Sequence, residues 1–302
     1  MKSRFFHYAL RITHYALLFI CAAIFFTPNN ACAETEWFWL DSNDKYSKYF
    51  EPASVTVTKK VVTNDGREIA IEIEAWTKTT YSYEGAAETI KNYELTKILP
   101  DPRSLSYSLA QLRVNPQNRT LQYVREDFYN ANGQVVWSKA ESGVKEINAR
   151  SFDEEFYCAI VDEVFQMGER DRKRAPSEQR WIELWTYTAE DGTTKNLTAD
   201  TTTMRLKGSN LILWEWEVTK NPEGKTTEIR FMKKAINLKQ GTEVIKEGGR
   251  VWTPTNSWQD LKDEYDGAYR MIKSDEPDYK GLVKLRAYVK KNSRWVMRYS
   301  LD

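Results

Sequence analysis

The sequence predicts an α+β protein made of two small antiparallel β-sheet domains, each with a packed helix, after an N-terminal signal peptide. Three observations favour this fold class. The chain of 302 residues has room for about two domains, and its aromatic content of 13% favours strands. Segments of alternating polar and apolar residues recur between turn signals. We expect domains at residues 34–168 and 181–302, joined by a charged linker at residues 169–180.

The first 33 residues have the parts of a signal peptide. The only charged side chains in this leader are basic: Lys2, Arg4 and Arg11. Residues 15–26 form an unbroken apolar run, and a small-x-small motif ends at Ala33. We therefore expect cleavage after Ala33 and export to the periplasm or cell surface. The run is shorter than the roughly twenty residues of a membrane span, and an uncleaved anchor is the alternative.

Cleavage would remove both histidines, His7 and His14, together with Cys21 and Cys32. The mature chain would keep one thiol, Cys158, and a net charge of −2. Without histidine, the commonest general base and metal ligand is absent. One cysteine supports neither an intrachain disulfide nor a cysteine-based zinc site. We expect no catalytic residues, no metal and no cofactor, and the mixed charge excludes the basic face that nucleic acid requires.

In the first domain, alternation and turn residues predict a series of strands. We expect them at residues 37–40, 46–50, 54–62, 68–79, 105–114, 119–129 and 134–140. Residues 81–93 suit a short helix or a loop, and residues 95–99 suit part of a strand. Ser151 and Glu154 have the spacing of a capping box, which predicts a helix that ends near Gly168.

The second domain resembles the first in its opening strands. We expect strands at residues 181–188, 201–206, 211–219, 226–238, 242–246 and 250–253, and a final hairpin of residues 281–288 and 294–301. Residues 258–273 have helical spacing. Trp181 matches Trp37, and residues 211–220 match residues 70–79. We interpret the two halves as a degenerate tandem repeat.

Several short motifs in the first domain occur in a characteristic order. They are Trp37-x-Trp39-Leu40, the pair Tyr46 and Tyr49, the corner Glu51-Pro52-Ala53-Ser54-Val55, residues 121–123, residues 128–136, and the helix from Ser151 to Cys158. This series, over about residues 37–165, resembles the surface-adhesin protein E domains. In that family a Trp strand precedes Tyr and an Asp-Pro-x-Ser-Ile corner, and a closing helix carries Cys.

The resemblance implies a small antiparallel sheet packed on a helix, located at the bacterial envelope, with a binding role rather than a catalytic one. Adhesive members of the family bind host matrix proteins and haem, but those ligands are not carried over to this chain. Two departures are visible. Glu51 replaces the family's Asp, and the family's cysteine pairing lacks a mature partner for Cys158.

Four aromatic residues are the candidate ligand surface: Trp76, Tyr81, Tyr83 and Trp216. Trp76 and Trp216 each break the apolar alternation of their strand. An outward Trp76 beside Tyr81 or Tyr83 would offer a stacking surface to a sugar or a peptide. Packing in the core or across strands is the competing interpretation.

Other chemistry receives weaker support. Glu72 and Glu74 share a strand face and could perform acid–base work at a glycosidic bond, although a solvated polar face explains them as well. Cys158 reads as a small buried hydrophobe, with an intermolecular disulfide as the alternative. Residues 41–44 resemble part of a calcium loop but lack its Gly and distal Glu, which favours a plain turn.

Together these features predict an exported, non-enzymatic envelope protein, an adhesin-like module that binds a protein or a small-molecule ligand. We expect no nucleic-acid partner, and membrane contact only through an uncleaved signal segment. A carboxylate-based hydrolase of wall polymers and a structural periplasmic assembly partner are the alternatives.

Overall fold

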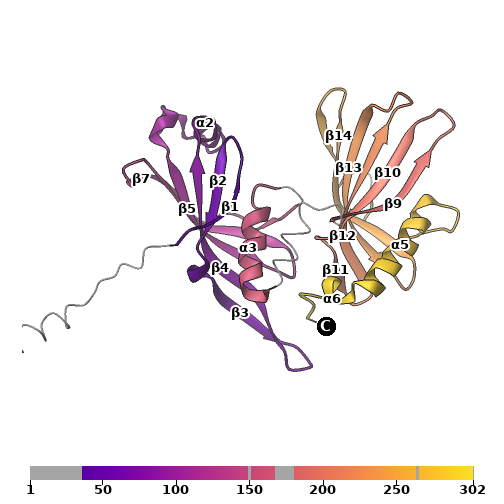
Figure 1. Ribbon diagram of the computed structural model, residues 1–302. Coiled ribbons are helices and arrows are strands. Elements are labelled where there is room, and N and C mark those ends of the chain that lie inside the picture. The colour runs from indigo at the N-terminus through magenta and orange to yellow at the C-terminus, as the bar shows by residue number, and fades with distance from the viewer. Residues whose placement is uncertain (1–35, 149–150, 167–179, 263–264, 302) are drawn as a thin grey trace, which may run out of the picture. The chain divides into compact units, whose positions relative to one another are not determined.

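Two antiparallel sheets of 8 strands each are present in the computed structural model, which describes residues 36–148, 151–166, 180–262 and 265–301 (Figure 1). Four α-helices accompany the sheets in these ranges. The expected α+β class with two small sheet domains is therefore confirmed. The expected signal peptide, residues 1–33, lies outside the described residues, and so does the expected linker at residues 169–180 except for Arg180.

The first sheet has the order β1-β2-β4-β5-β6-β7, with β3 paired to β4 and β8 paired to β6. Its strands are β1 (Phe38–Ser42), β2 (Tyr46–Phe50), β3 (Thr56–Val62), β4 (Glu68–Tyr81), β5 (Tyr107–Asn115), β6 (Thr120–Tyr129), β7 (Val135–Lys139) and β8 (Lys145–Glu146). Burial follows the alternation that predicted them. In β5 every second residue from Ser108 to Val114 is buried, so one face of the sheet forms the core.

The second sheet repeats this topology strand for strand. Its order is β9-β10-β12-β13-β14-β15, with β11 paired to β12 and β16 paired to β14. Its strands are β9 (Trp181–Thr188), β10 (Thr194–Asp200), β11 (Arg205–Lys207), β12 (Asn210–Lys220), β13 (Thr226–Asn237), β14 (Thr242–Trp252), β15 (Ser257–Asp260) and β16 (Arg270–Met271). β4 and β12, which contain the two matched sequences, hold the same place in the two sheets. A tandem repeat predicts this correspondence.

Each sheet carries a helix on its core face. The α-helices are α2 (Tyr83–Asn92), α3 (Glu154–Phe165), α5 (Pro277–Lys291) and α6 (Ser293–Val296). α3 buries Phe156 in the core of the first sheet, and α5 buries Leu282 in the core of the second. α2 settles the choice between helix and loop for residues 81–93, and its Ile90 belongs to a separate apolar cluster. Figure 1 shows α2 and α3 at different ends of the first sheet.

The expected C-terminal hairpin, residues 281–288 and 294–301, is wrong, because α5 and α6 occupy most of this part of the chain. Aromatic and β-branched residues suggested strands. However, Pro277 lies in the first turn of α5, Asp278 lies near the positive end of its dipole, and Lys290 lies near the negative end. The leucines that α5 buries are three residues apart, which is a helical spacing.

The expected helix at residues 258–273 is also wrong, since β15 and β16 both fall in this range. The ring of Trp258 stacks on Phe231 with centroids 4.9 Å apart. A Cβ on Gly249 would come within 2.2 Å of the Trp258 ring, so only glycine leaves room for this contact. A cross-strand aromatic contact therefore decides the structure of the segment, and its helical spacing is coincidental.

Two shorter expectations need correction. Residues 95–99, expected in a strand, contain the 3₁₀ helix Leu95–Lys97, and Leu95 packs in the apolar cluster of α2. The strand expected at residues 201–206 shrinks to β11, because residues 201–203 form a turn. In both places short-range apolar content was a poor guide to backbone conformation.

Gly85, in the first turn of α2, touches the backbone that leads into β2. A Cβ on Gly85 would lie 2.1 Å from the carbonyl oxygen of Lys45. We expect Gly85→Ala to lower the free energy of unfolding by about 1–3 kcal/mol, because the backbone cannot move aside as a flexible side chain can. Urea unfolding measures this. Gly143→Ala, whose Cβ would meet nothing within 4 Å, is the control, and equal stability of the two variants would contradict the prediction.

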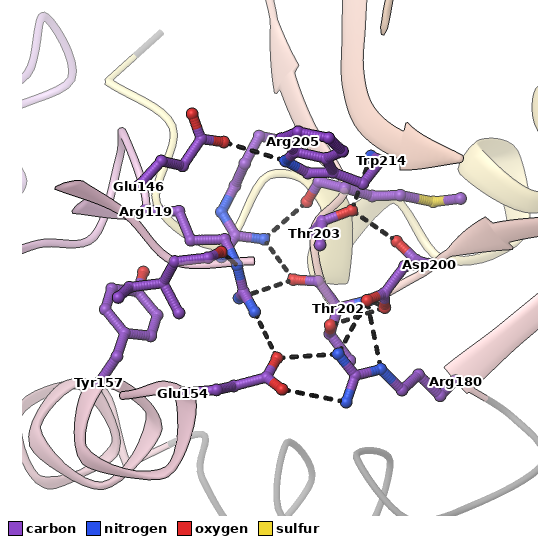
Figure 2. Close-up of polar contacts among 12 residues, drawn as sticks. Arg119, Glu146, Glu154, Tyr157, Arg180, Asp200, Thr202, Thr203, Arg205 and Trp214 are labelled. Carbon is purple, nitrogen blue, oxygen red and sulfur yellow. Dashed lines mark hydrogen bonds and ion pairs between the residues drawn. The ribbon is translucent and has the colours of Figure 1, made fainter. Parts of the chain in front are cut away.

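A buried cluster of charged residues joins elements of the two sheets inside the compact unit of residues 37–302. Glu154 accepts hydrogen bonds from Arg119 at 2.6 Å and from Arg180 at 2.8 Å. Arg180 also contacts Asp200 at 2.8 Å (Figure 2). All four side chains are at most 7% exposed. Because Arg180 is the last residue of the expected linker, at least this end of it is part of the folded structure.

The expected capping box of Ser151 and Glu154 is wrong, because the Glu154 side chain belongs to this buried charge cluster. α3 begins at Glu154, and the N-cap residue Asp153 makes no side-chain cap hydrogen bond. The Glu154 carboxylate binds arginines instead of reaching back to the cap. The helix ends before Gln166, which has a positive φ of 52°. Gly168, the expected stop, lies outside the described residues.

A second buried charge cluster lies on the second sheet. Lys234 contacts Glu215 at 3.0 Å and Glu243 at 3.2 Å, and none of the three is more than 6% exposed. Burial raises the pKa of Glu215 to about 7, although the charge of Lys234 acts in the opposite direction. One ammonium group therefore faces two carboxylates, and the folded state holds a proton here at mildly acidic pH.

Candidate functional site

Polar side chains interrupt the apolar core face of the first sheet. Toward α3 this face is apolar and includes Ile73 and Leu112, and toward α2 it is apolar again at Phe128. Between the two clusters, register places six polar residues on the same face, which we call the polar belt: Lys48, Thr77, Thr79, Ser108, Tyr123 and Glu126. Thr77 is 2% exposed, so it is buried in this face.

An irregularity in β6 completes the polar belt. Residues three apart on a regular strand point to opposite faces. Here Leu112 pairs with Tyr123 and Ala110 pairs with Glu126, so β6 uses three steps where β5 uses two. This β-bulge turns both Tyr123 and Glu126 toward the core face.

Glu126 is the centre of a hydrogen-bonded chain. The Tyr93 hydroxyl donates to Glu126 Oε2 at 2.8 Å, and Ser108 Oγ donates to Oε1 at 3.1 Å. The Tyr81 hydroxyl in turn donates to Ser108 Oγ at 2.7 Å. Glu126 is 6% exposed, and burial raises its pKa against the opposing effect of the hydrogen bonds from Tyr93 and Ser108. The raised pKa brings its carboxyl closer to a protonated, donating form.

The polar belt forms part of the floor of a cavity of about 430 Å³. Asp153 and Lys145 line its wall and form an ion pair, and the Tyr123 hydroxyl donates to Asp153 Oδ1 at 2.6 Å. Across the cavity, Lys139 Nζ lies 4.6 Å from the ring centre of Tyr93. We call this cavity the tyrosine pocket, after its characteristic residues Tyr46, Tyr81, Tyr93, Tyr123, Glu126 and Asp153.

The tyrosine pocket combines aromatic faces with groups of both charges. Its charged lining residues are the carboxylates of Glu88, Glu126 and Asp153 and the ammonium groups of Lys139 and Lys145. Burial, with a contribution from the charge of Glu126, raises the pKa of both Tyr81 and Tyr93. The two phenols therefore remain protonated hydrogen-bond donors at neutral pH. A ligand here would meet donors, acceptors and ring faces in one concave space.

The four residues expected as a ligand surface do not form one surface. Trp76 and Tyr81 lie on opposite faces of β4. Tyr81 is two residues beyond the core-face residue Thr79 and therefore shares its face, whereas Trp76 is three residues before Thr79 and points to the other face. The expected outward surface of Trp76 beside Tyr81 is therefore wrong. Tyr81 lines the tyrosine pocket, and Tyr83 is exposed on α2, with the Arg103 guanidinium 5.9 Å from its ring centre.

Trp216 lies on β12, in the second sheet. Its ring packs on Trp181 at 5.5 Å and on Phe231 at 5.6 Å between centroids. This is the cross-strand packing that was the competing interpretation. Trp76 is half-buried, and its backbone N–H donates to Ser54 Oγ at 2.8 Å. The corner that carries the family resemblance thus anchors the chain to β4.

Glu72 and Glu74 share a face as expected, but each is bound to a basic partner. Lys59 contacts Glu72 at 2.8 Å, and Arg113 contacts Glu74 at 2.7 Å. The hydrogen bond from Lys59 lowers the pKa of Glu72, although burial opposes it. A glycosidase needs an acid with a raised pKa, so this pair is a poor candidate for that chemistry.

The other candidate residues have structural surroundings. Cys158 is half-buried on α3 and packs against the core of the first sheet. In the turn at residues 41–44, Asn43 Oδ1 accepts hydrogen bonds from the backbone N–H groups of Lys45 and Tyr46, each at 2.9 Å. This local bonding is typical of a plain Asx turn.

Two further observations concern the described ranges as a whole. They contain no group of three or more His, Cys, Asp or Glu residues placed to hold a metal ion. No helix within those same ranges has both the length and the apolar character needed to cross a membrane.

Sequence reasoning did not identify Glu126, Asp153, Tyr93 or Tyr123 as site residues. One signal was available in β6. The large apolar and aromatic side chains at Leu121 and Tyr123 occupy alternate positions, but Phe128 falls an odd number of residues later. Such a change in the phase of the alternation marks a β-bulge. The convergence of α2, α3 and β6 on one cavity has no comparable local signal.

Comparison with known proteins adds no family assignment. No protein-family model matches the chain, and no curated protein matches it significantly. The resemblance of residues 37–165 to surface-adhesin protein E domains therefore stays a prediction.

Proposed function

We propose that this protein is exported to the cell envelope and there binds a small, polyhydroxylated ligand in the tyrosine pocket without transforming it. The observation that carries the proposal is the pocket itself, a cavity of about 430 Å³ whose polar floor lies between two apolar clusters. Ligand sites are typically concave, with a few convergent polar groups among aromatic and apolar ones. The basic leader, its apolar run and its small-x-small motif support export.

The composition of the pocket favours a neutral, hydroxyl-rich ligand. Tyr46 meets Phe152 edge to face at 5.2 Å and Tyr81 edge to face at 6.0 Å, and aromatic walls of this kind suit the apolar face of a sugar ring. Two of the three carboxylates already have lysine partners, because Glu88 pairs with Lys45 and Asp153 pairs with Lys145. A strongly charged ligand would find little uncompensated charge of the opposite sign.

Binding is favoured over hydrolysis because the carboxylates of the pocket are engaged. Tyr93 and Ser108 each donate to one oxygen of Glu126. Tyr123 donates to one oxygen of Asp153, and Lys145 pairs with the other. A general acid or base must reach the reacting atom of the substrate, whereas these groups orient the pocket floor. The resemblance of residues 37–165 to surface-adhesin protein E domains, which implies a binding role, is a further support.

One observation favours a second candidate function, the hydrolysis of a wall polymer. Glu126 and Asp153 line the same cavity, and burial raises the pKa of Glu126 while Asp153 adds to the shift. A pair of carboxyl groups, one of them an acid with a raised pKa, is the machinery of glycoside hydrolysis. On this hypothesis Glu126 is the proton donor and Asp153 is the second carboxyl group of the site.

Isothermal titration of the full chain with neutral mono- and disaccharides, including the amino sugars of cell-wall polymers, tests the proposal. We expect at least one sugar to bind saturably. Glu126→Gln and Tyr93→Phe should each weaken that binding about tenfold or more, because each removes a hydrogen bond from a buried network. Glu72→Gln, on the opposite face of the sheet, is the matched control and should leave the affinity unchanged.

Each result separates the candidates. Failure of every sugar to bind, or binding that ignores both pocket variants, would exclude the proposed function. Release of reducing ends by the wild-type chain, lost in Glu126→Gln while binding persists, would establish the hydrolase instead.

A further inference from the structure

A second cavity, of about 360 Å³, lies apart from the tyrosine pocket, between residues 115–118 and the segments of β11 and the C-terminus. Its polar wall includes Arg205, Lys207 and the amides of Asn115, Gln117 and Asn118. Its apolar wall includes Ile71, Leu206, Val296 and Leu301. Among the described residues, no carboxylate lines it. The cavity therefore offers positive charge on one side and hydrocarbon on the other.

Arg205 is the most deeply buried charge in this wall. Its side chain is 6% exposed, and its Nη1 donates to the carbonyl oxygens of Thr202 at 3.0 Å and Met204 at 2.7 Å. Its Nε has no hydrogen-bond partner in the described part of the chain. Within that part, no carboxylate forms an ion pair with Arg205. Figure 2 shows Arg205 beside the Thr202 segment and Arg119.

A second guanidinium increases the positive charge. Arg298 Nη2 donates to the same carbonyl of Thr202 at 2.7 Å, and its Nε likewise has no partner among the described residues. The two guanidinium groups lie over the ring of Tyr299, at 4.7 Å for Arg205 and 5.1 Å for Arg298. Ring and carbonyl contacts satisfy several N–H groups, but they neutralise neither charge.

The neighbouring arginines, unlike Arg205, have carboxylate partners. Arg119 pairs with Glu154, and Arg180 pairs with Glu154 and Asp200. Among the described residues Arg205 has no such partner, and burial together with the charge of Arg298 lowers its pKa to about 10. Burying an uncompensated guanidinium is costly, and a cavity beside it gives an anion a place to compensate the charge.

We propose that this cavity binds an organic carboxylate, with its anionic group beside Arg205 and Lys207 and its apolar body against Leu206, Val296 and Leu301. Lys207 Nζ donates to Asn118 Oδ1 at 3.0 Å. This hydrogen bond positions the ammonium group so that it and Arg205 can bind the same anion. A planar guanidinium matches the geometry of a carboxylate. Inorganic phosphate matches the charge too, but it leaves the apolar wall without a contact.

Titration of the full chain with three probes tests this site: hexanoate, hexanamide and inorganic phosphate. The readouts are isothermal titration and the arginine Nε–Hε resonances of ¹⁵N-labelled protein. We expect hexanoate to bind at least about tenfold more tightly than hexanamide, as a hydrogen-bonded charge pair should, and to shift the Arg205 resonance. Equal binding of hexanoate and hexanamide would overturn the proposal, and so would binding of phosphate without binding of hexanoate.

Variants assign the effect to the cavity. Arg205→Met should weaken hexanoate binding about tenfold or more, and Lys207→Gln roughly threefold, because Lys207 is exposed to solvent. Lys220→Gln, an exposed lysine on the same sheet, is the matched control and should bind like the wild type. If Arg205→Met does not fold, the test rests on the hexanoate affinity of Lys207→Gln and on the shift of the Arg205 resonance in the wild-type protein. Unchanged affinity in Lys207→Gln, or no shift of that resonance, would overturn the proposal.

Discussion

Replacing Glu154 with alanine is expected to lower the free energy of unfolding by about 3–5 kcal/mol, the cost typical of removing one partner from a buried ion pair. Glu154 is the only carboxylate that Arg119 contacts among the described residues, and it is also one of the two that contact Arg180. Its loss leaves the buried guanidinium of Arg119 with no described carboxylate in contact and only the more distant charge of Asp200 to compensate it. The same change weakens the link between α3 and the segment of Asp200, so both sheets are affected.

Urea unfolding followed by tryptophan fluorescence measures this effect. Trp181 is a suitable probe because it lies directly after Arg180, whose guanidinium carbon is 5.5 Å from the centre of the Trp181 ring. Glu163→Ala is the matched control, since Glu163 is exposed on the same helix and should change stability by no more than about 0.5 kcal/mol. A Glu154→Ala variant within about 1 kcal/mol of the wild type would mean that the cluster contributes little.

Replacing Lys234 with methionine is the second change expected to have a large effect, again about 3–5 kcal/mol at pH 8. Lys234 lies between Glu215 and Glu243, both almost fully buried. Methionine fills a similar volume without the charge, so the loss reports electrostatics rather than a cavity. Glu215 then loses its lysine partner beside a second buried carboxylate, Glu243, which keeps its ion pair with Arg270.

The effect of Lys234→Met should depend on pH in a defined direction. The folded-state pKa of Glu215 is raised to about 7 from the ordinary 4.5. A raised pKa means that the folded state binds a proton more tightly than the unfolded state, so this contribution to stability is full below pH 4.5 and is lost as pH rises through 7. At pH 5 a protonated Glu215 no longer needs Lys234, and the variant should lose less stability than at pH 8.

Unfolding midpoints at pH 5 and pH 8 test this dependence. Lys220→Met, an exposed lysine on β12, is the control and should show no such difference. The double variant Glu215→Gln, Lys234→Met should recover part of the loss at pH 8, because it removes the carboxylate that loses its cation, whereas Glu243 keeps its ion pair with Arg270. An equal loss at both pH values, with no recovery in the double variant, would contradict the assignment of the proton to Glu215.

Much of the sheet architecture follows from local sequence. The Asn64-Asp65-Gly66 turn joins β3 to β4, and the strands expected at residues 68–79 and 105–114 form as β4 and β5, with Ile73 and Leu112 in the core. The match of residues 70–79 to residues 211–220 correctly pairs β4 with β12, which occupy equivalent places in the two sheets. These features are predictable because strand period and turn chemistry depend on neighbours in the chain.

The chain from residue 258 onward was predicted poorly, and the reason lies in distant contacts. In residues 281–288 apolar side chains at positions 283, 285 and 287 alternate as in a strand, yet Leu282 and Leu285 bury against β9 and its neighbours as one face of α5. In residues 258–273 the stacking of Trp258 on Phe231 overrides helical spacing. Propensity is a weak guide where tertiary packing chooses between two possible periods.

The sequence by itself determined the class of the protein: two alternating β-rich halves, after an N-terminal segment with signal-peptide features and with no histidine beyond residue 14. Only the tertiary structure decided the sites. A bulge in β6 turns Glu126 inward beneath Tyr93. Arg205 is buried with no carboxylate partner in the described part of the chain, which makes it a candidate to bind an anion. The physical reason is that alternation reports which face a residue occupies, whereas burial and counter-charge depend on residues far away in the chain.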